Sequence, residues 1–516
     1  MRVVKRDTST PSAGEGDKSI TDGEDMALQQ SRVESIWPAE NISFPREFLM
    51  VFVSCMAQFC TQASFASVLY QLHIIGGSFD VTSAGRLAWL VAGYSLTVGT
   101  FILFSGRLGD AFGYKRMLLI GFAWFSLWSI IVGLSVYSNY TLIVFARVLQ
   151  GIGPAICLPN ALAILGSVYP PGHRKAMVFA FFGAVAPVGA VTGAAVASAI
   201  SLAWWPWAFW ALGLWLAALV ILGYIAIPDL PRKDDVFANG YNWQTLIDEL
   251  DLPGAVTGVS SLVLFNFAWN QATIVGWATA ETIVPLVLGL TIFGVFAWVE
   301  VKFAARPLLP FDSINGDVAF VLATVACGWA TFGIWILYLV QILEEIRHLS
   351  PLLAVAWSTP LAVAGTVAAI ITGLLLGRFQ VRPPVVMTLA LAAFAIGIIL
   401  IATVPPYQIY WGQIFVCTII IPFGMDMSFP AATLILSNAV KREHQGVGAS
   451  LVNTVVNYSI SLGVGFAGTV EVQVNHGDKL AGYRGALYFG TGLAGLGFGI
   501  CILFLIREHF MQRKAK

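Results

Sequence analysis

The sequence predicts an all-α polytopic membrane protein with fourteen transmembrane helices, and three observations support this. Of its 516 residues, 58% are hydrophobic and only 11% are charged, whereas a soluble domain carries about 25% charged residues. The mean hydropathy is +0.79. The apolar residues gather in fourteen runs of about 20 residues, the length that crosses a bilayer as a helix. A water-soluble fold cannot hide this much apolar surface.

The predicted spans follow a polar first segment. Residues 1–45 are rich in Ser, Thr, Gly, Asp and Glu, which predicts a disordered tail. We expect spans at about 48–69, 87–105, 117–136, 141–163, 176–198, 207–227, 252–270, 282–301, 318–340, 352–376, 384–403, 411–436, 447–470 and 486–506. Residues 228–251 form the longest predicted inner loop, and residues 507–516 form a second tail.

Charge predicts the orientation. An even number of spans puts both chain ends on one side of the membrane. With both ends inside, the inner loops hold thirteen basic residues and the outer loops hold four. The inner set is Arg107, Lys115, Arg116, Arg174, Lys175, Arg232, Lys233, Lys302, Arg306, Arg378, Arg382, Lys441 and Arg442, and the outer set is Arg86, Arg347, Lys479 and Arg484. Because Lys and Arg concentrate in cytoplasmic loops, both termini are predicted to be cytoplasmic.

A charged, glycine-rich stretch, GRLGDAFGYKR at residues 106–116, separates two of these runs and predicts a tight turn. Gly106 and Gly113 permit a sharp reversal and close helix approach. Asp110 can cap the next helix or pair with a cation. Lys115 and Arg116 favour the cytoplasmic face. An ordinary hairpin loop is the alternative interpretation.

Two stretches resemble the major facilitator superfamily. The pattern G-x-L-x-D-x-x-G-x-(K/R)-(K/R) at residues 106–116 is similar to the loop after the second span of that family, which implies a role in conformational gating. It departs from the usual form at Ala111 and Tyr114, where a basic residue is common. Residues 429–471 resemble a fungal group of aminotriazole-resistance, boron-efflux and low-affinity ammonium transporters, within the fourteen-span drug:proton antiporter branch.

The resemblance covers about residues 46–510 and implies a domain organisation. It implies the major facilitator fold, with six-helix bundles at 46–227 and 304–506 and an inserted helix pair at 252–303. The substrate site of such a fold lies between the bundles near the midplane. The resemblance also implies transport of a small molecule across the plasma membrane, or alternatively the vacuolar membrane. A partial repeat of the turn, in which Gly373, Leu375 and Arg382 match Gly106, Leu108 and Lys115, weakly supports two related halves.

Two charged residues inside predicted spans are the candidates for proton coupling, because such residues are expensive in lipid. Arg147 lies in ARVLQGIG of the fourth span, and we expect it to face a central cavity. With Gln150 and Gly151 it resembles the fourth-span motif that the superfamily uses in proton coupling. A structural arginine bonded to backbone carbonyls is the alternative.

Asp426 is the second candidate. It is the one acid near the middle of a predicted span, in PFGMDMSFPAA. A buried carboxyl can load and release a proton as access alternates between the two sides of the membrane. A structural acceptor between two helices is the alternative.

Polar stripes at helical spacing mark the candidate substrate cavity. Ser54, Gln58 and Gln62 lie four residues apart on the first span. Asn453, Asn457 and Ser461 repeat this spacing on the thirteenth span. Such faces either line a cavity or join helices by hydrogen bonds. We take Gln58, Gln62, Gln150, Asn453 and Asn457 as cavity candidates. The first span carries no acid, whereas many fourteen-span antiporters have an Asp there.

The function these features favour is proton-coupled efflux of a small molecule by alternating access. No G-x-x-x-x-G-K-[ST] loop is present, so a gradient and not ATP would drive it. One proton moving down about 100 mV gains ~2.3 kcal/mol and one pH unit adds ~1.4 kcal/mol. Together these support a roughly 500-fold gradient of a neutral solute.

Three other functions stay open. A uniporter or facilitator, for example for ammonium or borate, would show flux without proton countermovement. A nutrient sensor would need a signalling domain, for which the inner loops leave little room. An enzyme is disfavoured because the six cysteines and six histidines show no metal-binding spacing. We therefore expect no cofactor, no metal and no nucleic-acid partner, and we expect a monomer in the lipid bilayer.

Overall fold

The computed structural model describes residue 38 and residues 42–170, 172–229, 243–304, 306–309, 316–439 and 445–515. The predicted tail at 1–45 lies almost entirely outside this part of the chain, as does the middle of the predicted loop at 228–251. Among the basic residues used for orientation, Arg232, Lys233, Lys441 and Arg442 also lie outside it.

The described residues form helices and no strands, and the all-α prediction is confirmed. The first half comprises α3 (Phe44–Leu69), α4 (Leu72–Gly77), α5 (Ala84–Phe112), α6 (Tyr114–Leu134), η1 (Ser135–Tyr137), α7 (Tyr140–Gln150), α8 (Ile152–Val168), α9 (His173–Ser201) and α10 (Pro206–Ala226). The middle comprises α11 (Trp243–Leu250), α12 (Leu252–Val275) and α13 (Ala280–Lys302).

The second half follows the same plan. It comprises α14 (Gly316–Gln341), η3 (Ile342–Ile346), α15 (Pro351–Ser358), α16 (Pro360–Gly373), η4 (Leu374–Arg378), α17 (Pro383–Ala402), α18 (Gln413–Ala439), α19 (Gln445–Val474) and α20 (Lys479–Ala515). Fourteen helical segments of the described chain are long and apolar enough to cross a membrane, and each coincides with one predicted span.

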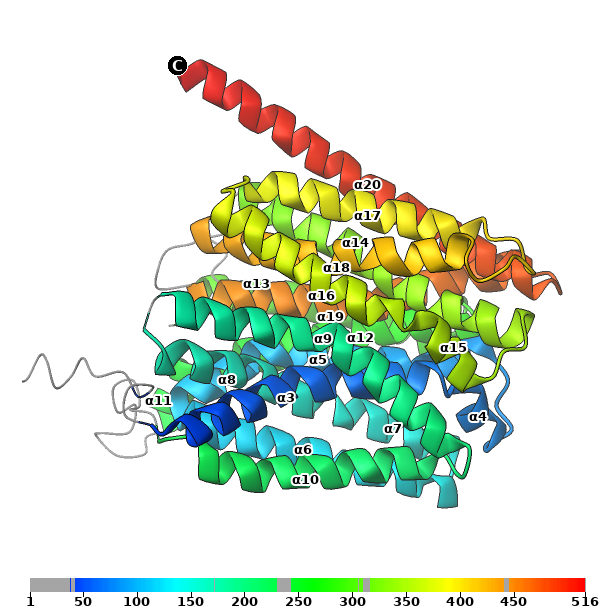
Figure 1. The fold of residues 1–516 in the computed structure, drawn as a ribbon, viewed down its shortest axis with the longest axis horizontal. Coiled ribbons are helices and arrows are strands. Elements are labelled where there is room, and N and C mark those ends of the chain that lie inside the picture. The colour runs from blue at the N-terminus through cyan, green and yellow to red at the C-terminus, as the bar shows by residue number, and fades with distance from the viewer. Residues whose placement is uncertain are drawn as a thin grey trace, which may run out of the picture.

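The helices run side by side along the long axis of the molecule (Figure 1). Helix α3 begins and α20 ends at the same end of the bundle, which we call the terminal face. The other end, where α4 and α15 lie, is the opposite face. Two membrane segments are interrupted. The fourth breaks at Gly151, and the tenth breaks at Thr359 because Pro360 has no N–H for the preceding turn.

The two halves meet along α5 with α19 and α9 with α16. The approach is close at Gly99 of α5, where an added Cβ would lie 2.6 Å from the backbone nitrogen of Tyr458 on α19. Glycine at this position lets the two backbones touch. Across this seam Ser461 Oγ also donates a hydrogen bond of 2.8 Å to the carbonyl of Ala92.

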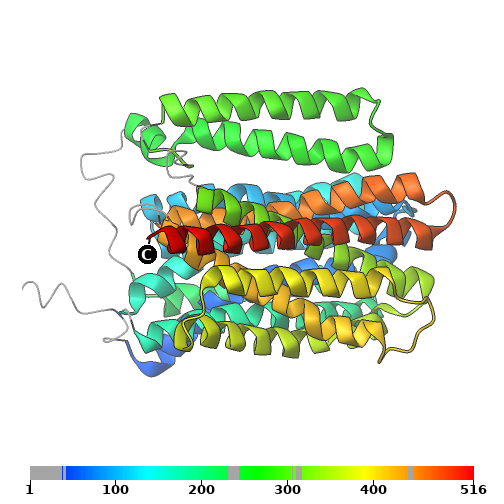
Figure 2. The same cartoon turned by 90° about the horizontal axis from the view of Figure 1, so that it is seen from above.

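The inserted pair, α12 and α13, lies at one edge of the molecule (Figure 2). Helix α12 packs on α5 and α19, and Tyr458 donates a 3.0 Å hydrogen bond to the Leu262 carbonyl. Helix α13 packs mainly on α12 and exposes large apolar side chains such as Phe293 and Trp298. This surface suits contact with lipid, because large exposed apolar patches mark surfaces that meet a membrane or a partner.

Candidate functional site

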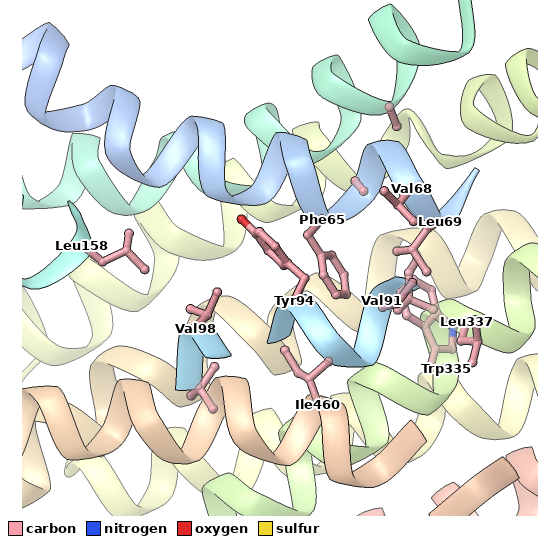
Figure 3. Close-up of a cluster of buried hydrophobic side chains, with 14 of the residues drawn as sticks. Phe65, Val68, Leu69, Val91, Tyr94, Val98, Leu158, Trp335, Leu337 and Ile460 are labelled. Atoms are coloured by element: carbon pink, nitrogen blue, oxygen red, sulfur yellow. The ribbon is translucent and has the colours of Figure 1, made fainter. Parts of the chain in front are cut away.

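A cavity of about 210 Å³ lies between the two halves. Its walls come from α3, α5, α8 and α9 of the first half and from α14, α15, α16, α18 and α19 of the second. Part of the wall appears in Figure 3, where Phe65 of α3 and Tyr94 of α5 lie next to each other and Ile460 of α19 faces them. The structure therefore has a cavity where its two halves meet, and a substrate site there stays a prediction.

Aromatic side chains form much of the cavity wall. They come from five helices and from the residue that follows α3, and they are Phe65, Tyr70, Tyr94, Phe182, Trp329, Phe332, Trp335 and Phe429. Sequence reasoning missed this set. The spacing of Trp329, Phe332 and Trp335 at three-residue intervals on one helix was the available signal, because residues three apart share a helix face.

Polar groups enter this apolar surface from three helices. Gln58 and Gln62 of α3, Asp426 of α18, and Asn453 and Asn457 of α19 all line the cavity. One of the two polar stripes also joins helices by a hydrogen bond. Ser54 and Ser461, the outlying members of the two stripes, are buried and bonded to Met50 O and Ala92 O. The Ser54 bond stays within α3, so of the two stripes the α19 stripe joins helices, through Ser461, while the amides of both stripes line the cavity.

Asp426 lies on the α18 wall, close to the seam with α9. Its Oδ2 atom is buried and has no hydrogen-bond partner among the described residues. A Cβ added to Gly365 of α16 would lie 3.0 Å from Asp426 Oδ2 and 2.8 Å from the ring of Pro187 on α9. Glycine at 365 therefore lets the carboxyl and an α9 proline from the other half occupy neighbouring positions.

Arg147 does not face the cavity, and that expectation is wrong. Its side chain is fully buried. Its Nε donates to Leu90 O at 3.0 Å, and its Nη1 donates to Ser64 Oγ at 2.9 Å. The guanidinium lies 4.3 Å from the centre of the Tyr94 ring. The ring separates Arg147 from the cavity, and a buried charge is tolerated here because it is fully hydrogen-bonded.

Gln150 is also absent from the cavity wall, which corrects a second expectation. It is fully buried, accepts a hydrogen bond from Arg147 and donates one of 2.7 Å to Ser129 Oγ. Arg147 and Gln150 thus join four helices, α3, α5, α6 and α7, into one hydrogen-bonded unit. This geometry agrees with the alternative interpretation, in which Arg147 is a structural arginine.

The predicted turn at residues 106–116 is shorter than expected. Helix α5 continues to Phe112 and α6 starts at Tyr114, so Gly113 alone makes the reversal. Its φ of +96° lies in the region that favours glycine. Gly106 lies inside α5 beside Ser450 of α19, where an added Cβ would make an ordinary contact of 3.4 Å.

Three charged residues at this turn, Asp110, Lys115 and Arg116, are exposed or make exposed contacts. Asp110 neither caps α6 nor forms an ion pair in the described structure; it accepts a 2.5 Å hydrogen bond from the Tyr114 hydroxyl. Lys115 lies 3.0 Å from Asp229, whose side chain is 96% exposed. Arg116 is exposed. Arg107, by contrast, is anchored by backbone carbonyls near the inserted pair, including that of Arg306 at 2.5 Å.

The cavity is closed at the opposite face by contacts between the halves. Tyr70, just beyond α3, donates a 2.7 Å hydrogen bond to Ser358 Oγ of α15. Burial raises the pKa of the Tyr70 hydroxyl, which keeps it protonated as a donor. His73 of α4 contacts Gln341 and Glu345 of the second half. Sequence reasoning did not identify this closure, because the partners lie far apart in the chain.

Comparison with known proteins places these features in a family. The model of the Major Facilitator Superfamily matches residues 48–464. The chain is 48% identical to the Low affinity ammonium transporter of Saccharomyces cerevisiae, covering 95% of this chain and 94% of that protein. It is 41% identical to Efflux pump terG of Aspergillus terreus, covering 96% and 93%. The predicted resemblance to this fungal transporter group is confirmed.

The fold also matches a solved structure. A peptide transporter POT in complex with sulfate superposes with a TM-score of 0.65 over 90% of this chain and 95% of the other, at 15% identity. Identity this low shows a common fold alone. The part of the chain that the structure describes has fourteen helical segments long and apolar enough to cross a membrane and a cavity between two packed halves. With the family match over residues 48–464, these features show that the chain belongs to the major facilitator superfamily.

Proposed function

We propose that this protein is a proton-coupled carrier that exports a small molecule by alternating access. One observation carries the proposal: Asp426, a carboxyl with a buried, unpartnered oxygen, lines a cavity between two halves that meet at a glycine-lined seam. A carboxylate in an apolar wall is costly unless it gains a partner, so a proton or a cationic substrate stabilises it. Alternating access then exchanges these two occupants.

The cavity wall suits an amphipathic solute. Aromatic rings surround the space, and its amide and carboxyl groups come from Gln58, Gln62, Asn453, Asn457 and Asp426. Pockets of this composition bind apolar bodies and use a few polar groups to orient them. A facilitator of ammonium is the second candidate, because one relative is named a Low affinity ammonium transporter. It would use Asp426 as a cation site without moving a proton in return.

Arg147 has a different role in this proposal from the one its motif implies. It is bonded on all sides and shielded by Tyr94, so it holds α3, α5 and α7 together behind the cavity wall. We assign the proton that is exchanged for cargo to Asp426 and not to Arg147. The turn at Gly113, with Asp110, Lys115 and Arg116, then acts in gating by fixing how α5 and α6 move together.

The orientation belongs to the same proposal. The terminal face carries the larger share of basic residues in the sequence, which supports a cytoplasmic location for it. The closure at Tyr70 and Ser358 is then the outer gate, and the structure corresponds to a state sealed from the outside. We propose the plasma membrane as the location and a monomer as the working unit.

The test is transport into proteoliposomes under an imposed pH gradient. Two probes, ethidium and radiolabelled methylammonium, separate an aromatic cation from an ammonium-sized one. The wild type should accumulate a probe when the lumen is acidic, by up to about tenfold for one pH unit, because one-for-one exchange of a proton for a monovalent cation moves no net charge. Asp426→Asn should still fold and exchange the probe but lose accumulation driven by the pH gradient.

A matched control is Glu281→Gln, which removes an exposed carboxylate outside the cavity, one that accepts a 3.1 Å hydrogen bond from Gln271. This variant should accumulate the probe as the wild type does. Accumulation by Asp426→Asn at the wild-type level would refute the assignment. Methylammonium flux without proton movement in the wild type would favour the facilitator.

A further inference from the structure

The outer closure contains an ionisable link between the two halves that the carrier proposal does not use. His73 lies on the short helix α4 of the first half. Its Nε2 is 2.6 Å from Gln341 Oε1, and its Nδ1 is 3.2 Å from Glu345 Oε1. The imidazole therefore bridges the end of α3–α4 to the end of α14 and η3, across the seam that must open for outward access.

The chemistry of these two contacts depends on a proton. Both facing atoms are oxygens that accept hydrogen bonds, and a neutral imidazole can donate from only one nitrogen. Only the doubly protonated, positively charged ring satisfies both contacts at once. Its bond to Glu345 is then a charge-assisted hydrogen bond, which is stronger than a neutral one. Loss of the proton leaves one of the two contacts without a hydrogen and removes the positive charge that faces the Glu345 carboxylate.

Glu345 is held in place from its own half. Lys479 of α20 lies 2.7 Å from Glu345 Oε2, and Tyr483 donates a 2.8 Å hydrogen bond to the same oxygen. The carboxylate is therefore fixed on the second half whatever the state of His73. The link across the seam depends on the histidine, whose side chain is 28% exposed and so can exchange protons with water at this face.

Other titratable groups surround this link and must be separated from it. Glu344 of η3 and Glu471 of α19 lie on the second half, where Glu471 accepts a 2.8 Å hydrogen bond from Tyr338. On the first half, Asp80 and Arg86 are exposed between α4 and the start of α5. Histidine is the side chain that ordinarily changes charge between about pH 5 and 8.

We propose that His73 is a second proton-binding site, which latches the opposite face closed when protonated and releases it when neutral. Under the proposed orientation this is the outer face, so external acid would hold the gate shut between transport cycles. The inference depends on geometry at the closure and not on which solute is carried. It differs from the Asp426 proposal, because this proton regulates access and is not exchanged for cargo.

The experiment measures opening of the opposite face as a function of pH. Spin labels attached through Leu202→Cys, beyond α9, and Tyr407→Cys, in the α17–α18 loop, report the distance between the halves; these positions are 76% and 84% exposed. The full chain is placed in lipid nanodiscs at pH 5.5 and pH 8. In the wild type the ratio of open to closed populations should rise about tenfold at pH 8, as loss of a charge-assisted hydrogen bond predicts.

Variants of the link give the decisive comparison. His73→Lys keeps a positive charge, so the face should stay closed at both pH values. His73→Gln should show the same open fraction at both. Glu345→Gln removes the pairing charge from the other side and should also abolish the pH response, which guards against misfolding of a single variant. His476→Gln, an exposed histidine of the same face, should respond as the wild type does.

Each outcome decides for or against the latch. A pH response that survives His73→Gln overturns it, as does loss of the response in His476→Gln. The same measurement in an Asp426→Asn background separates the two proposals. If the response persists there, the latch stands even if Asp426 proves unnecessary for coupling. If Asp426→Asn removes the response and His73→Gln does not, opening is governed by the cavity carboxyl and the latch is wrong.

Discussion

Alanine at Gly99 tests whether the two halves depend on close contact between α5 and α19. A Cβ at this position would lie 2.6 Å from the backbone nitrogen of Tyr458 and 3.0 Å from its Cα. Ordinary contacts of this kind are about 3.5 Å or longer, so the helices must separate by nearly an ångström. Backbone atoms cannot turn aside as a flexible side chain can.

The expected cost follows from this overlap. Overpacking of a close contact costs about 1–3 kcal/mol. That energy destabilises any state in which α5 and α19 touch here, so it changes the balance between conformations by a factor of about 5 to 150. Gly99→Ala should therefore lower the thermal midpoint and shift the Leu202–Tyr407 distance distribution away from the closed form.

Gly106→Ala is the matched control on the same helix and the same seam. Its added Cβ would lie 3.4 Å from the Ser450 hydroxyl, which is an ordinary contact. We expect its thermal midpoint and distance distribution to stay near those of the wild type. Equal effects of Gly99→Ala and Gly106→Ala, or no effect of either, would refute the reasoning that backbone contact at Tyr458 sets the geometry of the seam.

Two further predictions concern single residues of the first half. Arg147→Met should lower the free energy of unfolding by about 3 kcal/mol or more, and with it the thermal midpoint, because several charge-assisted hydrogen bonds are lost. The pH dependence of the transport that remains should match that of the wild type. A changed pH profile would show that Arg147 takes part in proton coupling. Gly113→Ala should cost about 1–3 kcal/mol because of its positive φ. Gly377→Ala, at the equivalent end of the tenth span, has a negative φ and open space, so an equal loss of stability there would contradict the strain argument.

Membrane spans were predictable from the sequence because the bilayer imposes a length on apolar runs. The predicted boundaries fail mainly at the terminal face, where α5 and α6 extend until only Gly113 separates them. Charged residues do not terminate a helix, but they mark where it leaves the hydrocarbon layer of the membrane. The composition of residues 106–116 therefore placed the reversal between the two helices correctly but overestimated the length of the loop.

The cavity was predictable in part. The free-energy cost of a charged side chain in lipid indicated Asp426, and helical spacing placed Gln58 and Asn457 on polar faces. All three residues line the cavity. The same free-energy cost led to a wrong position for Arg147, because a buried charge needs hydrogen-bond partners and the sequence does not show which residues supply them. The Ser64 and Leu90 acceptors are 83 and 57 residues away along the chain. Only packing brings them to the guanidinium.

Long-range pairing also explains why the latch was not predicted. His73 and Gln341 are separated by 268 residues. A histidine in a short outer segment has no periodic pattern that marks it as a contact between halves. Aromatic residues were similarly uninformative in composition, because 13% of the chain is aromatic and most spans contain some. The packing of the helices decides which of these aromatic residues line the cavity.

The central claim is that a proton on Asp426 is exchanged for cargo, and a reversed gradient tests it most directly. Vesicles containing the purified protein and a trapped pH-sensitive dye are prepared without a pH gradient, and an outward gradient of the transported probe is imposed. The account predicts that probe efflux moves protons inward and acidifies the lumen, and that Asp426→Asn abolishes this signal while probe efflux continues. Equal acidification by Asp426→Asn, or probe efflux with no proton movement in the wild type, would contradict it.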